Sequence, residues 1–61
     1  MRMLPGDPNI LLSYVNMKLR DGYESLSDLC AALDEDEAAL RERLSAAGWR
    51  YDVTLNQFVR E

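Results

Sequence analysis

The chain has 61 residues, a net charge of −4, a single cysteine and no histidine. A domain this short has a core that rarely supplies more than about 3–5 kcal/mol, and many such domains gain stability from a disulfide, a metal or a partner subunit. The lone Cys30 excludes an internal disulfide, the lack of histidine excludes the common zinc spacings, and the acidic balance repels nucleic acid phosphates.

The amino-terminal segment MRMLPGDP lacks the apolar core of a signal peptide. The longest apolar-rich run, ILLSYV at 10–15, is too short to span a bilayer. Together with the lone thiol, these features predict a cytoplasmic protein. We expect residues 1–61 to form one domain.

The first predicted helix covers residues 8–21. Asp7 followed by Pro8 is a strong start signal, because the aspartate side chain accepts from an unpaired N–H and proline fits the first helical position. Gly22 is expected to lie beyond its end. At 100° per residue, this helix has two separate apolar faces. The first face holds Leu11, Leu12, Val15 and Leu19, and the second holds Ile10, Tyr14 and Met17.

Polar side chains separate these two faces. They are Ser13, Asn16 and Arg20 on one flank, with Lys18 and Asp21 nearer the other. Two interpretations of the second apolar face remain open. The helix either lies between the other elements, so that both faces are internal, or the second face contacts another subunit.

The second predicted helix covers residues 26–33 and begins after Ser25, which forms a variant of the capping box with Asp28. Its core stripe consists of Leu26, Leu29, Cys30 and Leu33. Cys30 is expected to be a buried, inert thiol rather than a reactive one, because no histidine or lysine lies near it in sequence to lower its pKa.

An acidic run at 34–37 precedes the third predicted helix, 35–47. It lacks the alternating oxygen ligands, the glycine and the distal glutamate of a calcium loop, so no metal site is predicted. Acidic groups instead favour a helix N-terminus, and we expect Asp34 to be the cap. Glu37 and Arg41 have the i,i+4 spacing of an ion pair. The side chains expected to be buried are Leu40, Leu44 and Ala47.

A β-hairpin is predicted at 49–59, after Gly48 ends the third helix in a left-handed conformation. Asp52 can open the turn, and Asn56 tolerates a positive φ. The predicted fold class is therefore mainly α with a C-terminal β-hairpin, a three-helix winged helix-turn-helix-like domain.

The aromatic side chains of the hairpin have two possible uses. Tyr51 and Phe58 are the natural cross-strand pair to face the helices. Together with Trp49 they could instead form a stacking platform for bases. Packing is the favoured interpretation, because so small a core needs large apolar side chains.

Three segments carry a resemblance to a known family: MLPGDP (3–8), LLSYVNMKLRD (11–21) and AAGWRYDVTLNQF (46–58). They resemble a family of small uncharacterised bacterial proteins described only as a domain of unknown function. This resemblance implies a free-standing cytoplasmic bacterial protein, and it supplies no activity, substrate or catalytic residue. A looser resemblance to winged helix-turn-helix domains, through residues 25–52, is shared by DNA-binding and protein-docking modules.

The most specific part of the resemblance is NMKLRD, residues 16–21. Met17 and Leu19 are expected to pack. The polar members of this segment are Asn16, Lys18, Arg20 and Asp21. They have two possible roles, one in fixing the end of the helix and one in contacting a partner.

The sequence contains no nucleophile–base pair, phosphate-binding loop or metal cluster, so neither an enzyme nor a cofactor is predicted. The favoured function is a non-catalytic module acting through protein–protein interaction or homodimerisation. Its candidate partner-binding residues are Ile10, Tyr14, Asn16, Met17, Lys18, Arg20 and Asp21.

The alternative is a DNA-binding transcriptional regulator, with the third helix in the major groove. The first residues of that helix are acidic and oppose docking onto phosphates. The candidate DNA-binding residues are Arg41, Arg43 and Arg50. This reading therefore ranks second.

Overall fold

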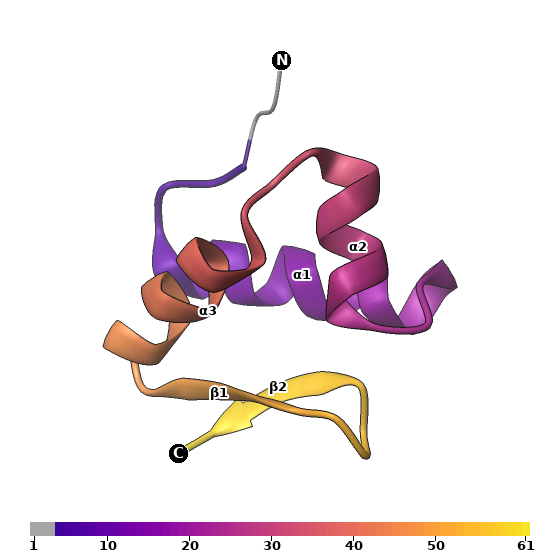
Figure 1. Ribbon diagram of the computed structural model, residues 1–61. Coiled ribbons are helices and arrows are strands. Elements are labelled where there is room, and N and C mark those ends of the chain that lie inside the picture. The colour runs from indigo at the N-terminus through magenta and orange to yellow at the C-terminus, as the bar shows by residue number, and fades with distance from the viewer. Residues whose placement is uncertain (1–3) are drawn as a thin grey trace.

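A computed structural model describes residues 4–61 as three helices followed by a two-stranded antiparallel hairpin (Figure 1). The elements are α1 (Pro8–Gly22), α2 (Leu26–Leu33), α3 (Glu37–Ala46), β1 (Trp49–Asp52) and β2 (Gln57–Arg60). In Figure 1, α3 crosses in front of α1, and the hairpin lies below both helices. This architecture confirms the predicted fold class. None of the helices within residues 4–61 has the length and apolarity needed to cross a membrane.

The start of α1 follows the predicted signal. The Asp7 side chain accepts hydrogen bonds from the backbone N–H groups of Asn9 (2.8 Å) and Ile10 (3.4 Å). The end of α1 lies one residue beyond the predicted range, because Gly22 keeps a negative φ and continues the helix. The chain becomes extended at Tyr23.

The prediction that Asp34 caps the third helix is wrong. Asp34 instead ends α2 in the left-handed region, with φ 57° and ψ 45°. Aspartate tolerates this conformation better than most residues, because its short polar side chain can hydrogen-bond locally. Because Asp34 ends α2 and reverses the chain, α3 begins later than predicted, at Glu37 rather than residue 35.

Asp36 is the residue that caps α3. Its side chain accepts from the N–H groups of Ala38 (2.9 Å) and Ala39 (3.3 Å). Ser25 caps α2 as predicted, because its hydroxyl accepts from the N–H of Asp28 at 3.1 Å. The turn between the helices therefore uses two aspartates for two different tasks.

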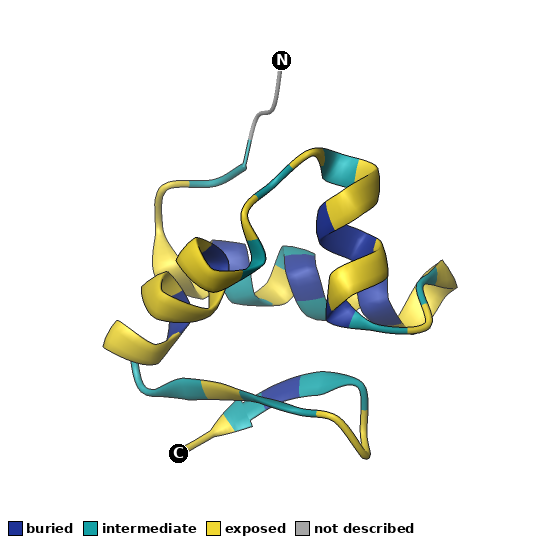
Figure 2. Cartoon of the chain, viewed as in Figure 1, coloured by how far each residue is buried: buried dark blue, intermediate teal, exposed yellow. Residues whose placement is uncertain are grey.

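The core lies where the three helices and the hairpin meet, and Figure 2 shows the buried residues on the inward sides of the helices. The buried residues are Leu11, Val15, Leu19, Leu26, Leu29, Cys30, Leu40, Leu44 and Phe58. Three residues predicted to be buried, Leu12, Leu33 and Ala47, are only half-buried. Leu12 and Leu33 pack against the margin of this core.

The hairpin has the predicted register and turn. Tyr51 lies opposite Phe58, with ring centroids 5.5 Å apart. The Asp52 side chain accepts from two backbone N–H groups of the turn at 2.9 and 3.2 Å. Asn56 has a φ of 54° and Gly48 a φ of 93°, both in the left-handed region.

Candidate functional site

The side of α1 that faces away from the core carries an apolar surface, which we call the outer face and define by Ile10 and Met17. Ile10 is 59% exposed and Met17 is 39% exposed. Seven residues span almost two helical turns, so these two side chains project in nearly the same direction. Large apolar side chains that remain exposed together on one helix face are a feature of interaction surfaces.

Tyr14, the third member of the predicted second apolar face, lies at the margin of the outer face. It is half-buried and packs against the core. The ammonium of Lys18 lies 5.6 Å from the centroid of its ring, in cation–π contact. The core therefore takes up part of Tyr14, whereas Ile10 and Met17 remain open to solvent.

Asn16, another predicted partner-contact residue, joins α1 to the hairpin. Its Nδ2 donates to the carbonyl oxygen of Phe58 at 3.1 Å, and its Oδ1 accepts from the N–H of Phe58 at 2.8 Å. The Gln57 side chain donates to the backbone oxygen of Asn16 at 3.1 Å. The Asn16 carboxamide therefore occupies the place of a third strand along the free edge of β2.

Arg20 and Asp21, at the C-terminal end of α1, lie in solvent. The Arg20 Nε is 4.0 Å from Asp21 Oδ1, and the two side chains are 75% and 66% exposed. A pair this exposed contributes little to stability. Both side chains are therefore accessible to a partner beside the outer face.

A polar network absent from the sequence predictions ties the hairpin turn to the start of α2. The Tyr51 hydroxyl donates to Asn56 Oδ1 and accepts from the Leu26 N–H at 3.2 Å. Asn56 Nδ2 donates to the carbonyl oxygen of Tyr23 at 2.9 Å. Two of these hydrogen bonds join residues that are 25 and 33 positions apart in the chain, so no local sequence pattern predicts the network.

Glu37 connects α2 and α3 through two partners. Its Oε1 accepts from the Ser27 hydroxyl at 2.7 Å, and its Oε2 accepts from Arg41 Nε and Nη2 at 3.2 and 3.1 Å. The hydrogen bond from Ser27, followed by those from Arg41 and its positive charge, lowers the pKa of Glu37. The predicted i,i+4 pair is thus present, with an additional contact from α2.

Two of the three candidate DNA-binding arginines have partners within the chain. Arg41 pairs with Glu37 and lies 5.3 Å from the Tyr51 ring centroid. Arg43 Nη2 donates to the carbonyl oxygen of Pro5 at 3.0 Å. Arg50 is exposed on β1. These three guanidinium groups therefore do not form one uncommitted basic patch.

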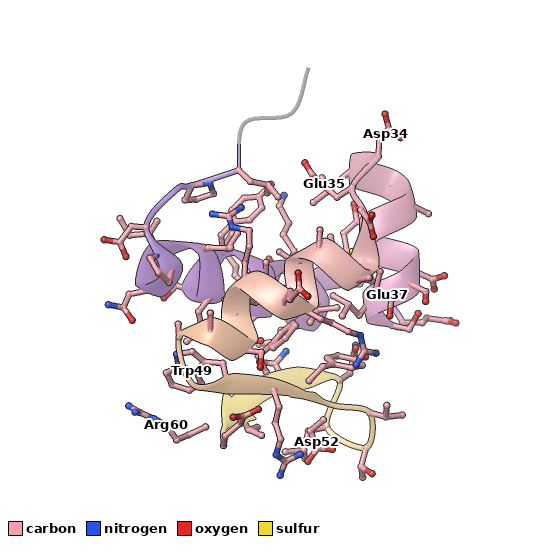
Figure 3. All side chains as sticks on the ribbon, turned by 60° about the vertical axis from the view of Figure 1, so that its left-hand side comes forward. Asp34, Glu35, Glu37, Trp49, Asp52 and Arg60 are labelled. Atoms are coloured by element: carbon pink, nitrogen blue, oxygen red, sulfur yellow. The ribbon has the colours of Figure 1, made fainter. Side chains whose placement is uncertain are left out.

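The two ends of the hairpin differ in how their side chains are used. Figure 3 shows Trp49 and Arg60 together at the end next to α3, where the guanidinium lies 4.7 Å from the Trp49 ring centroid. At the opposite end, in the turn that follows Asp52, Val53 is 75% exposed and Leu55 is 60% exposed. The sequence predictions placed these two residues in a turn without identifying an exposed apolar tip.

Cys30 is buried, as predicted. Burial, with smaller effects from the carboxylates of Glu37, Glu35 and Asp36, raises the pKa of its thiol. The thiol therefore stays neutral near pH 7 and has little nucleophilic character. Across residues 4–61, no three histidine, cysteine, aspartate or glutamate side chains lie together in a way that could hold a metal ion.

Comparison with known proteins identifies the family. A family model described as "Domain of unknown function (DUF4250)" matches residues 5–58. Neither the comparison with curated proteins nor the comparison with solved structures gave a match. Because the match covers nearly the whole chain, the protein belongs to the family described as domain of unknown function DUF4250.

Proposed function

We propose that the protein is a non-catalytic interaction module that binds a protein partner, or a second copy of itself, through the outer face of α1. The observation that supports this proposal is the joint exposure of Ile10 and Met17 almost two helical turns apart. The lone buried thiol supports the cytoplasm as the setting of this interaction.

The energetics favour burial of this face. Removing a large apolar side chain from water contributes roughly 1.5–3 kcal/mol when the side chain becomes fully buried. A small domain has little stability to spare, so any partner that binds only the folded chain shifts the folding equilibrium appreciably. Ser13, Arg20 and Asp21 would form the polar rim that surrounds the apolar centre of a typical interface.

A pair of glutamate substitutions at equally exposed positions tests this proposal. Ile10 on the outer face and Leu55 at the hairpin tip are 59% and 60% exposed. Ile10→Glu introduces an acid into the first turn of α1, which has none, so it is expected to leave the helix stable. Each variant and the wild type would carry the same tag, and bound proteins would be identified by mass spectrometry after pull-down from the source cell.

We expect the wild type and Leu55→Glu to retain the same protein partner, including untagged copies of this chain if it associates with itself. Ile10→Glu should lose that partner while keeping its circular dichroism spectrum. Loss of the partner from Leu55→Glu alone would place the interaction surface at the hairpin tip and contradict the proposal.

DNA binding is the second candidate, supported by the winged helix-turn-helix-like order of α2, α3 and the hairpin. Three features argue against it. The N-terminus of α3 carries Asp36 and Glu37, Arg41 is paired with Glu37, and the chain has a net charge of −4. A duplex approaching α3 would meet carboxylates before any unpaired guanidinium group.

A salt titration distinguishes this second candidate. Fluorescence anisotropy with labelled duplex DNA should give no sequence-selective complex at submicromolar protein. If DNA binding is the function, affinity will fall steeply as salt rises, and Arg50→Ala will weaken it further. Such a complex would move DNA binding ahead of the interaction module.

A further inference from the structure

We propose that the partner of the outer face is a second copy of this chain, and that the two α1 helices pair antiparallel with Ile10 of each copy opposite Met17 of the other. This inference rests on the proposed function and names the partner that it leaves open. It is carried by two properties of α1, the joint exposure of Ile10 and Met17 on one face and the opposite charges of Asp7 and Lys18 on one flank.

Ile10 and Met17 are equidistant from a point between Ser13 and Tyr14. Ile10 lies three residues before Ser13, and Met17 lies three residues after Tyr14. A two-fold axis through this point, perpendicular to the helix, places Ile10 of one copy at the height of Met17 of the other, and the contact occurs twice. Both exposed side chains of each copy are then covered by their counterparts.

A parallel pair would cover the same side chains but would bring like charges together. It would place Ile10 against Ile10 and Met17 against Met17, and it would bring Asp7 of one copy beside Asp7 of the other. Juxtaposed like charges are unfavourable. The antiparallel arrangement separates the two aspartates to opposite ends of the contact.

The charges on one flank of α1 complement each other in the antiparallel pair. Asp7 and Lys18 are eleven residues apart, which is close to three helical turns, so they lie on the same flank as Tyr14. In an antiparallel two-fold pair the same flanks of the two helices meet. Asp7 of one copy then lies about 3 Å along the axis from Lys18 of the other, at about 1.5 Å per residue.

Both groups are available for this contact. Asp7 uses Oδ1 to cap α1, and within residues 4–61 its Oδ2 accepts no hydrogen bond. Among residues 4–61 the Lys18 ammonium forms no salt bridge, and it lies 5.6 Å from the centroid of the Tyr14 ring. Such an interface is short and its charges lie at the rim, so the pairing is transient and depends on protein concentration.

Disulfide trapping tests the arrangement, because a disulfide forms only when the two Cα atoms are within about 7 Å. Ile10→Cys and Met17→Cys proteins would be mixed and oxidised with oxidised glutathione, one of them carrying a tag that separates it by mass. In the proposed pair, residues 10 and 17 of opposite copies face each other. Two copies of residue 10 are about 10 Å apart along the axis, since seven residues rise about 1.5 Å each.

Ser13→Cys gives a second cross-linking test of the arrangement, in which Ile10 and Met17 are both kept. The two copies of residue 13 lie on the same flank beside the two-fold axis, so this variant should form a disulfide with itself. Leu55→Cys is the control for collisional cross-linking, because residue 55 is as exposed as residue 10. Wild type is the control for the native thiol, which is buried.

We expect the mixed 10–17 disulfide to exceed the 10–10 and 17–17 disulfides by at least about tenfold, and Ser13→Cys to dimerise faster than Leu55→Cys. Predominance of the 10–10 and 17–17 products would overturn the antiparallel arrangement. A second copy would be overturned as the partner by two results together. Wild type would sediment as a monomer at all concentrations, and the cysteine variants at positions 10, 13 and 17 would cross-link no faster than Leu55→Cys. The proposed function would then stand or fall on the pull-down with Ile10→Glu.

Discussion

Asn16 shows how one side chain can determine the position of a whole element. Its carboxamide satisfies both the N–H and the carbonyl oxygen of Phe58, a residue in the middle of β2. The sequence predicted two possible roles for Asn16, helix-end stabilisation or partner contact. The structure adds a third role that depends on a residue 42 positions away, and no spacing rule connects two such positions.

Replacing Asn16 by alanine should lower the free energy of unfolding by about 1–3 kcal/mol, because it leaves polar backbone groups of Phe58 without partners beside the core. Urea denaturation measures this change. Ser13→Ala, an exposed position on the same helix, is the control and should stay within about 0.5 kcal/mol of wild type. Equal midpoints for Asn16→Ala and Ser13→Ala would show that the hairpin does not depend on this contact.

The Glu37 carboxylate gives the fold a defined dependence on acid. A carboxyl group with a lower pKa in the folded chain than in the unfolded chain stabilises the fold above the unfolded value, here 4.5. This stabilisation is lost as the pH falls through the lower folded pKa. Wild type should therefore lose stability below about pH 4.5 more steeply than Glu37→Gln, which cannot titrate.

The comparison requires thermal melts of both proteins between neutral and acid pH. Glu42→Gln, at an exposed position on the same helix, is the matched control for the removal of one carboxylate. Identical slopes for wild type and Glu37→Gln would mean that the contacts of Ser27 and Arg41 with Glu37 do not persist in solution.

At the scale of elements, the signals that lie next to each other in the sequence were sufficient. Asp7 with Pro8, Ser25 and Gly48 each mark a boundary through a hydrogen bond or a backbone conformation that they make locally. The acidic run between α2 and α3 was not sufficient. Each of its acids is compatible with a cap, and the choice of Asp36 depends on where the chain leaves α2 through the left-handed Asp34.

This division of tasks predicts different responses to substitution. Asp36→Ala removes the cap of α3 and should cost about 0.5–2 kcal/mol. Asp34→Gly should cost less than Asp36→Ala, because glycine adopts a positive φ without the strain of a side chain. Urea midpoints for the two variants decide the assignment. A larger loss for Asp34→Gly than for Asp36→Ala would restore Asp34 as the cap.

The packing of α2 on α3 depends on side chains that periodicity identified correctly. Leu29 and Leu44 are fully buried, and Leu40 is 3% exposed. Leu40→Ala should cost about 2–5 kcal/mol, a large part of the stability of so small a domain. Leu55→Ala, at the exposed tip, should have the same melting temperature as wild type. A Leu40→Ala protein that melts within a few degrees of wild type would remove this residue from the core.

For the whole molecule, the sequence predicted the order of elements and most of the core. It did not predict which side chains of the second apolar face of α1 are covered and which stay exposed. Periodicity places Ile10, Tyr14 and Met17 together, and it cannot tell which of them the folded chain covers. In the structure Tyr14 packs against the margin of the core, whereas Ile10 and Met17 stay exposed. The exposed tip formed by Val53 and Leu55 was not predicted, because turn residues give no periodic signal.

Sedimentation of the wild type, Ile10→Glu and Leu55→Glu over a range of concentrations tests the proposed self-pairing through the outer face most directly. The account predicts that the average mass of the wild type and of Leu55→Glu rises with concentration, because their outer faces can pair. Ile10→Glu should stay monomeric and folded, since a charge within the contact opposes pairing without entering the core. A wild type that remains a monomer up to about 1 mM, or an Ile10→Glu protein that associates as wild type does, would contradict it.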